Sequence, residues 1–320
     1  MQTLLAILLL LVGFVLLIKG ADIFVEASVG IAKKLKIPNV VIALTIIAMG
    51  TSAPEVMISV TAAVNGSTSL AVGNVVGSNL FNLLFIIGLC AMLKAIPVRY
   101  KDIARDYWLS IVATVLLLGM MLLFAEAIPR LSSAVFLLIF AVYVIALVRQ
   151  ALKHRTEEQP PEKPEEAEKK PRPLWRNILF ALAGVVLIVV GGDLTVDNAV
   201  NIAHTIGMSE RIVGLTIVAA GTSLPELITS LVACKKGQTD IAIGTVIGSN
   251  IFNILFVLGI TGVVMPLAID PSLVLDVVIL TAGSLAFIVF VGTGQRVVRA
   301  EGFVMVAIYA VYMTSAVLMS

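Results

Sequence analysis

Apolar runs near the length of a bilayer span recur along the whole chain, and short polar segments separate them. This pattern predicts about ten membrane-spanning helices, at residues 3–20, 39–63, 70–93, 106–125, 131–149, 175–193, 212–233, 240–264, 273–294 and 302–319. No positive residue precedes the first run, and no small-residue cleavage pattern follows it. We therefore expect this run to be retained as a span and not removed as a signal peptide.

Composition supports an all-α membrane protein. Of the 320 residues, 59% are hydrophobic and 13% are charged, which leaves too few polar side chains to cover a soluble globule of this size. The formal net charge of +2 is uninformative as a total, and we expect the lipid bilayer, and no nucleic acid, as a partner. Cys90 and Cys234 lie in or beside apolar runs, where cysteine behaves as a small apolar residue.

One segment interrupts the hydrophobic pattern. Residues 149–176 contain QPPEKPEEAEKKPRP, a composition that cannot bury apolar surface, so we predict an exposed, disordered linker. This linker separates two predicted five-helix units, residues 1–148 and 177–320.

The two units repeat each other at a constant offset of 171 residues. The offset superposes Gly50-Thr51-Ser52-Ala53-Pro54-Glu55 on Gly221-Thr222-Ser223-Leu224-Pro225-Glu226, and Gly77-Ser78-Asn79-Leu80-Phe81-Asn82 on Gly248-Ser249-Asn250-Ile251-Phe252-Asn253. A match of this length indicates an internal duplication. Because five spans per unit is an odd number, the second unit should enter the membrane from the opposite side, as an inverted repeat.

The distribution of basic residues gives the orientation. With the N-terminus outside, only Arg130 and Arg211 of the 22 basic residues fall in outer loops. Because cytoplasmic loops carry the excess of Lys and Arg, we predict a cytoplasmic linker and two outer termini. In a Gram-negative bacterium, the protein would lie in the inner membrane with both termini in the periplasm.

Two carboxylates stand alone inside predicted spans. Glu55 is the only acidic or basic residue between Ile37 and Leu93, and Glu226 is the only one between Ile212 and Cys234. A carboxylate within a bilayer costs several kcal/mol unless it is compensated, so it marks a pathway or a site by default. Asp22, Glu26, Asp193 and Asp197 lie near predicted span ends, and we expect them to be interfacial polar residues rather than ligands.

The residues around each glutamate predict a broken helix. Pro54 has no amide hydrogen, so it should free the carbonyl of Gly50, and Pro225 should free that of Gly221. Thr51 and Ser52 precede Glu55 by four and three residues, so a helical turn would bring them to the same side.

The second motif adds further oxygen atoms. Ser78 and Asn82 are four residues apart, as are Ser249 and Asn253, so each pair should share a helix face. The alternative for these four residues is bonding across helices, and for the neighbouring glycines it is close helix packing. Hydroxyl, amide, carbonyl and carboxylate oxygens suit Ca²⁺ or Na⁺, whereas the absence of His and Cys among these candidate ligands argues against Zn²⁺, Cu or Fe.

At these residues the sequence resembles the calcium:cation antiporter family, which includes the sodium/calcium exchangers. GTSAPE with GNVVGSNLFN, and GTSLPE with GTVIGSNIFN, are similar to the two α-repeats of that family. The resemblance implies that Glu55 and Glu226 are shared Ca²⁺ and Na⁺ ligands. It implies further ligands at Thr51, Ser52, Thr222, Ser223, the carbonyls of Ala48 and Ala219, Ser78, Asn82, Ser249 and Asn253.

The resemblance also implies a transporter and not an enzyme, with Ca²⁺ and Na⁺ as transported ions, no cofactor and a site complete within one chain, so that a monomer suffices. We expect Ca²⁺/Na⁺ exchange by alternating access. Some family members carry Asp where this chain has Asn253, so H⁺-coupled Ca²⁺ exchange stays open as the alternative. A cation channel with a paired-glutamate filter is a further alternative.

Overall fold

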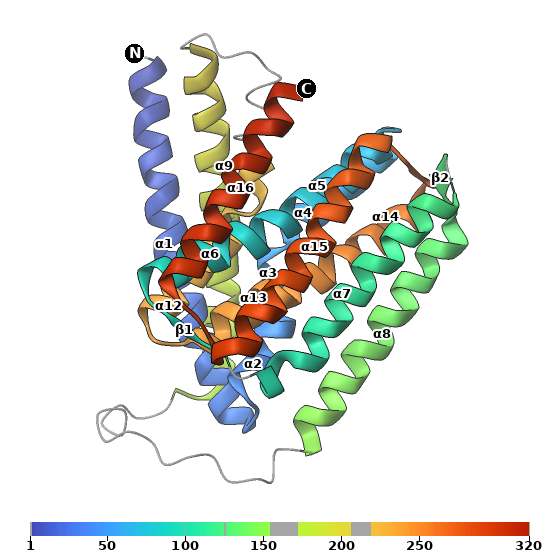
Figure 1. Cartoon of the computed structure of the whole chain (residues 1–320). Coiled ribbons are helices and arrows are strands. Elements are labelled where there is room, and N and C mark those ends of the chain that lie inside the picture. Colours follow the sequence, from blue (N-terminus) through green and yellow to red (C-terminus); the bar gives the residue numbers. More distant parts are fainter. Residues whose placement is uncertain (1, 99, 125, 154–171, 206–218, 320) are drawn as a thin grey trace.

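The computed structural model describes residues 2–98, 100–124, 126–153, 172–205 and 219–319, and nearly all of them are helical. The α-helices are α1 (Gln2–Leu35), α2 (Asn39–Ile42), α3 (Ala48–Thr51), α4 (Ala53–Val64), α5 (Thr68–Leu80), α6 (Ile87–Leu93), α7 (Tyr100–Leu123), α8 (Arg130–Lys153), α9 (Leu174–Thr205), α11 (Ala219–Thr222), α12 (Leu224–Lys235), α13 (Thr239–Ile251), α14 (Leu258–Val264), α15 (Pro271–Gly294) and α16 (Arg299–Met319). Figure 1 shows the start of α1 and the end of α16 at one end of the molecule, and the end of α8 at the other.

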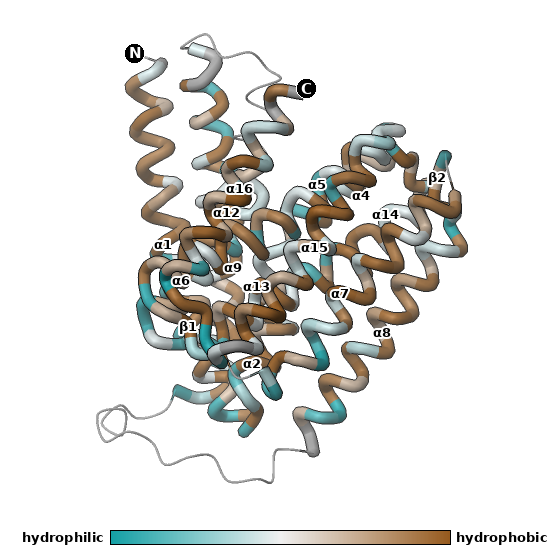
Figure 2. Tube along the Cα trace, in the orientation of Figure 1, coloured by the Kyte–Doolittle hydropathy of each residue, from teal (hydrophilic) through white to brown (hydrophobic). Residues whose placement is uncertain are grey.

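Several of these helices are suited to a membrane. Within the described residues, seven helices are long and apolar enough to cross a bilayer, or eight if the bent pair Asn39–Thr51 and Ala53–Val64 is one span. Large apolar side chains cover their outer faces, as at Leu131, which is 79% exposed. Figure 2 shows hydrophobic residues along the outer helices and hydrophilic residues mainly at helix ends. A count of ten spans and the inverted topology stay predictions.

The first and sixth predicted spans are much longer helices than the sequence suggested. The predicted bounds 3–20 and 175–193 are wrong at their C-terminal ends, because α1 continues to Leu35 and α9 to Thr205. No proline interrupts either helix, and α1 ends only where Lys36 adopts a positive φ of 55°, two residues before Pro38.

Helices α1 and α9 pack against each other at very short range (Figure 1). An added Cβ at Gly191 would lie 2.7 Å from the amide nitrogen of Leu17, and one at Gly184 would lie 2.9 Å from that of Phe24. Added Cβ atoms at Gly13 and Gly20 would be similarly close to α9. Glycine at these four positions therefore allows the two backbones to touch, as small residues do in membrane helix pairs.

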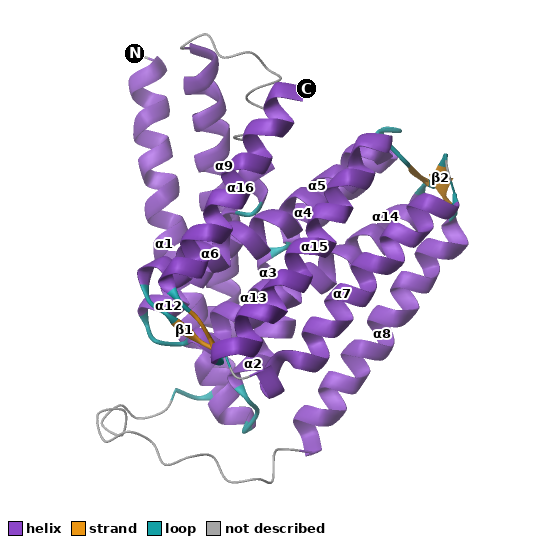
Figure 3. Ribbon diagram, in the orientation of Figure 1, coloured by secondary structure: helices purple, strands orange, loops and turns teal. Residues whose placement is uncertain are grey.

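The centre of the molecule is formed by the interrupted helices of the two motifs. In an apolar 18-residue stretch within residues 239–264, 94% of positions are buried, and in such a stretch within residues 68–93 the share is 78%, compared with 28% within residues 130–151 of α8. Within the described residues, three π-helical segments interrupt these central helices: η1 (Ala43–Ile47), η2 (Phe81–Ile86) and η6 (Phe252–Val257). Figure 3 shows that the described structure is almost entirely helical. Gly248 packs against η1, since an added Cβ would lie 2.8 Å from the Cα of Leu44.

Four longer helices, α7, α8, α15 and α16, pack around this centre (Figure 1). Two small antiparallel pairs tie the loops between them: β1 (Ile96–Pro97) with β4 (Arg296–Val297), and β2 (Ala127–Ile128) with β3 (Leu267–Ala268). The predicted disorder of the linker falls mainly on residues 154–171, which lie outside the described residues.

Candidate functional site

Each of the two Gly-Thr-Ser-x-Pro-Glu segments contains a helix break at its serine. Helix α3 ends at Thr51, Ser52 leaves the helical region with φ −84° and ψ 14°, and α4 starts at the next residue, bent by 47°. In the second segment, Ser223 separates α11 from α12 with φ −92° and ψ 8°. The predicted broken helix is therefore present in both segments, and each glutamate lies in the first turn after the break.

The breaks send each serine to the glutamate of the other repeat. The Ser52 hydroxyl donates a hydrogen bond to Glu226 Oε1 at 2.7 Å, and the Ser223 hydroxyl donates one to Glu55 Oε1 at 3.3 Å. Spacing predicted that Ser52 lies on the same side as Glu55, and it did not predict that the Ser52 hydroxyl bonds to the glutamate of the other repeat. The crossed bonds instead join the two repeats at one point.

The serines of the second motif, Ser78 and Ser249, also contact the two glutamates. Ser249 donates to Glu226 Oε1 at 3.4 Å, and its oxygen lies 3.1 Å from that of Ser52. Ser78 lies 3.5 Å from Glu55 Oε1 as a donor. Each glutamate therefore receives one serine from its own repeat and one from the other repeat.

The second oxygen of each carboxylate, Oε2, is available for another contact. Glu55 and Glu226 are fully buried, and the Oε2 atom of each has no hydrogen-bond partner within the described residues. Buried polar groups are normally paired, and an unpaired buried charge is costly. Two such oxygens at one point, with four hydroxyls around them, suit a cation.

The other predicted ligands of the first repeat are close by in the chain but already have internal contacts. Thr51 is buried, and its hydroxyl donates to the carbonyls of Ile47 at 3.1 Å and Ala48 at 3.3 Å. The Ala48 carbonyl also accepts the Ser52 amide at 3.0 Å. In the second repeat Thr222 is largely buried at the end of α11. Ala219 is the first residue of α11, directly after the undescribed residues 206–218.

The asparagines of the second motif depart from the prediction. Asn82 and Asn253 lie in π-helical segments, so they do not simply follow Ser78 and Ser249 on one α-helical face. The side-chain nitrogen of Asn82 donates to Asn250 Oδ1 at 3.1 Å, and that of Asn253 donates to Asn79 Oδ1 at 3.0 Å. Sequence reasoning did not single out Asn79 and Asn250, although both belong to the repeated motif.

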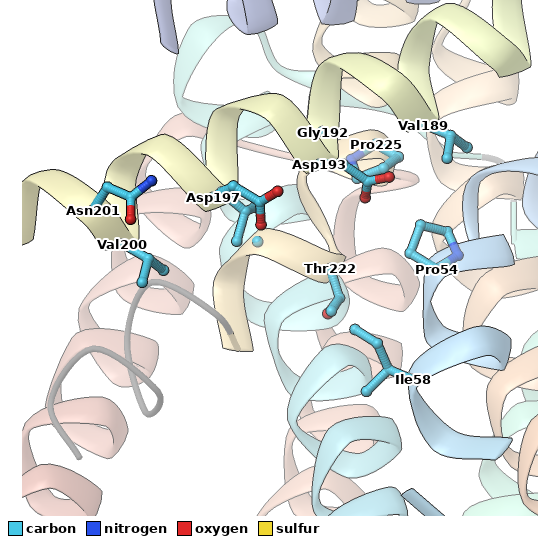
Figure 4. A pocket seen from close by; sticks show the side chains of 12 residues that line it. Pro54, Ile58, Val189, Gly192, Asp193, Asp197, Val200, Asn201, Thr222 and Pro225 are labelled. Carbon is cyan, nitrogen blue, oxygen red and sulfur yellow. The ribbon is translucent and has the colours of Figure 1, made fainter. Parts of the chain in front are cut away.

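A cavity of about 530 Å³ lies between the second half of α9 and the two Pro-Glu turns (Figure 4). Asp193 and Asp197 line one wall, and Pro54, Thr222 and Pro225 line the other. These two aspartates were expected to be interfacial, and they lie well inside α9 because that helix extends to Thr205.

The matching acids of the first repeat have basic partners. Asp22 Oδ1 lies 2.7 Å from Lys236 Nζ, and Glu26 Oε1 lies 3.0 Å from the Arg172 guanidinium. Equivalent positions in the two repeats therefore have different surroundings: ion pairs in α1, and a cavity wall in α9.

Known proteins match this chain over most of its length. The family model for the sodium/calcium exchanger protein matches residues 5–149 and 176–318. The putative antiporter CaxA of Alkalimonas amylolytica is 41% identical over 314 residues, which is 97% of this chain and 98% of that protein. The sodium/calcium exchanger MaX1 of Methanosarcina acetivorans is 31% identical, covering 96% of this chain and 97% of that protein.

Solved structures give the same result. A structure of the sodium-calcium exchanger NCX_Mj, soaked with zero Na⁺ and Ca²⁺, aligns with a TM-score of 0.83 and 28% sequence identity. The alignment covers 98% of this chain and 99% of that one.

A further sequence relative is named for its membrane. The inner membrane protein YrbG of Escherichia coli is 37% identical over 84% of this chain and 82% of its own length.

Proposed function

This chain belongs to the sodium/calcium exchanger family of multi-pass membrane transporters, and we propose that it exchanges Ca²⁺ for Na⁺ by alternating access. The observation that carries this proposal is the pair of buried carboxylates joined crosswise by serines of the opposite repeats. Each carboxylate presents one oxygen that has no partner within the described residues. Two carboxylates neutralise one Ca²⁺, and the hard oxygen donors around them suit Ca²⁺ and Na⁺.

The remaining predicted ligands take supporting positions in this proposal. Glu55 and Glu226 are the shared ligands at the centre. The flanking cation positions use Thr51, Ser52, Thr222, Ser223, the backbone carbonyls of Ala48 and Ala219, Ser78, Asn82, Ser249 and Asn253. Pro54 and Pro225 supply no amide hydrogen to the carbonyls four residues earlier, and irregular backbone at membrane depth is tolerated where it lines a site, so the helix breaks are compatible with this role.

The charge of the site favours exchange over leak. Two buried carboxylates without a cation are unfavourable in a low-dielectric surrounding. The switch of the site from one side of the membrane to the other is therefore slow when the site is empty, and it is faster when Ca²⁺ or Na⁺ is bound. The cavity beside Pro54, Thr222 and Pro225 supports access to this site from one side of the membrane.

We also propose ten spans in two inverted five-helix repeats, with both termini outside and the linker in the cytoplasm. The location of both chain ends at one end of the molecule, opposite the end of α8, supports this topology (Figure 1). The bacterial relative named an inner membrane protein supports that membrane as the location. One chain supplies both glutamates, so a monomer is sufficient for transport.

A sodium gradient is expected to drive Ca²⁺ uptake, and a pH gradient alone is not. Asn82 and Asn253 are amides and provide no further carboxylate that could carry a proton, which favours Na⁺ over H⁺ as the ion that replaces Ca²⁺ at the two glutamates. The measurement is Ca²⁺ uptake into proteoliposomes with either gradient imposed separately at clamped membrane potential.

Liposomes without protein serve as the control for passive leak. Uptake that follows the pH gradient and ignores Na⁺ would identify H⁺-coupled exchange and reject the proposed coupling ion. Uptake that requires neither counter-ion would indicate a channel and reject exchange.

A further inference from the structure

Asn79 and Asn250 form a reciprocal connection between the two repeats. Asn79 Nδ2 donates a hydrogen bond to the backbone carbonyl of Asn250 at 3.1 Å, and Asn250 Nδ2 donates one to the backbone carbonyl of Asn79 at 3.3 Å. Both side chains are buried, one in α5 and the other in α13. We call these two residues the amide clasp.

The clasp fixes which atom of each amide points in which direction. A backbone carbonyl can only accept hydrogen bonds, so each clasp residue must direct its Nδ2 toward it. The Oδ1 atoms of the clasp are then the acceptors for the next pair. Asn250 Oδ1 accepts from Asn82 Nδ2 at 3.1 Å, and Asn79 Oδ1 accepts from Asn253 Nδ2 at 3.0 Å.

Among the described residues, these hydrogen bonds leave one side-chain oxygen without a donor at each end of the asparagine network. Because Asn82 and Asn253 use their nitrogens on the clasp, their Oδ1 atoms are the ends that remain. Both oxygens are buried and have no hydrogen-bond partner within the described residues. Asn82 lies in η2, which packs against α12 with Glu226, and Asn253 lies in η6, which packs against α4 with Glu55.

We propose that Asn79 and Asn250 are positioning residues, each of which holds the amide of the other repeat's asparagine with its oxygen toward the cation site. Asn79 acts on Asn253, and Asn250 acts on Asn82. Without the clasp, an amide can turn over and present its NH₂ group, which repels a cation. This inference rests on the proposed function, since it concerns ligands of the same site.

The test is the dependence of Ca²⁺ binding on crossed pairs of substitutions. The apparent Ca²⁺ affinity of the purified full chain is obtained from the rise of its unfolding temperature with Ca²⁺ concentration. Each variant is compared with its own calcium-free value, so that a general loss of stability cancels. Asn74→Ala serves as the control, because Asn74 lies in the same helix and its side chain bonds to Ser59, outside the clasp.

Asn79→Ala and Asn253→Ala are each expected to weaken Ca²⁺ binding by about tenfold, the effect of leaving one buried polar group misdirected. The double variant Asn79→Ala/Asn253→Ala should be no weaker than Asn253→Ala alone, because both changes remove the same oxygen. Asn79→Ala/Asn82→Ala should lose about a hundredfold, because it removes two separate oxygens. Asn74→Ala should bind as the unsubstituted chain does.

Two results would overturn the inference. If Asn79→Ala binds Ca²⁺ normally, or if its effect multiplies with that of Asn253→Ala, the clasp does not position the ligand oxygens. A different result would contradict the proposed function itself. If the unsubstituted chain shows no Ca²⁺-dependent stabilisation, the proposed function is wrong, and this inference is wrong with it.

Discussion

Replacing Glu226 with Gln is expected to lower Na⁺-driven Ca²⁺ uptake by at least about a hundredfold. The substitution keeps the shape of the side chain but removes its charge, and it places an NH₂ group among the hydroxyls of Ser52 and Ser249. A divalent cation would then face one carboxylate in a buried site, with about 3–5 kcal/mol of lost interaction. The measurement is initial uptake in proteoliposomes loaded with Na⁺, normalised to inserted protein.

Glu55→Gln should have an equally large effect, because the two repeats contribute one carboxylate each. Glu126→Gln is the matched control: it makes the same chemical change at an exposed glutamate between α7 and β2. All three variants should insert into the membrane to the same extent. Normal transport by either Glu55→Gln or Glu226→Gln would rule out a shared site.

Gly191→Val is expected to destabilise the protein by about 3 kcal/mol and to lower its unfolding temperature in detergent. The Cβ atom alone would lie 2.7 Å from the Leu17 nitrogen and 2.8 Å from the Gly13 carbonyl oxygen. Both are backbone atoms of α1, so no side chain can turn aside to make room. The two helices would have to separate along a contact that includes all four of their facing glycines.

Gly119→Val separates this packing effect from the general cost of valine in a helix. Gly119 is an exposed residue in α7, and an added Cβ there has no neighbour within 4 Å in the described structure. Its unfolding temperature should change little. Equal losses in both variants would show that helix propensity, and not the approach of α1 and α9, explains the effect.

The central glutamates could be predicted from sequence because their surroundings are free of other charges. Intramembrane carboxylates are expensive, so composition alone distinguishes Glu55 and Glu226 from the rest of the chain. Proline also predicts the helix break, since it removes a backbone donor at a fixed position. Both features depend only on residues that are neighbours in the sequence, so they can be predicted without knowledge of the fold.

The partners across the repeats could not be predicted, because they depend on the packing of distant segments. Spacing places Ser52 one helical turn from Glu55, yet the break turns its hydroxyl to Glu226. No propensity rule predicts the π-helical turns at Phe81 and Phe252 that displace Asn82 and Asn253. The amide clasp follows from both of these features.

The length of α1 was underestimated for a different reason. A charged residue within an apolar run normally marks the end of a span, so Asp22 and Glu26 indicated an interface. In the structure both acids have cationic partners, Lys236 and Arg172, and the helix continues past them. Pairing between distant residues thus overrides the local polarity signal.

The contact between Asp22 and Lys236 joins α1 to the C-terminal end of α12 at a partly exposed position. The two side chains are 45% and 30% exposed, and ion pairs in such surroundings contribute at most about 1 kcal/mol. That energy changes a population ratio by about a factor of five. Salt in solution weakens a partly exposed pair of this kind, so the pair contributes little to holding the end of α12 against α1.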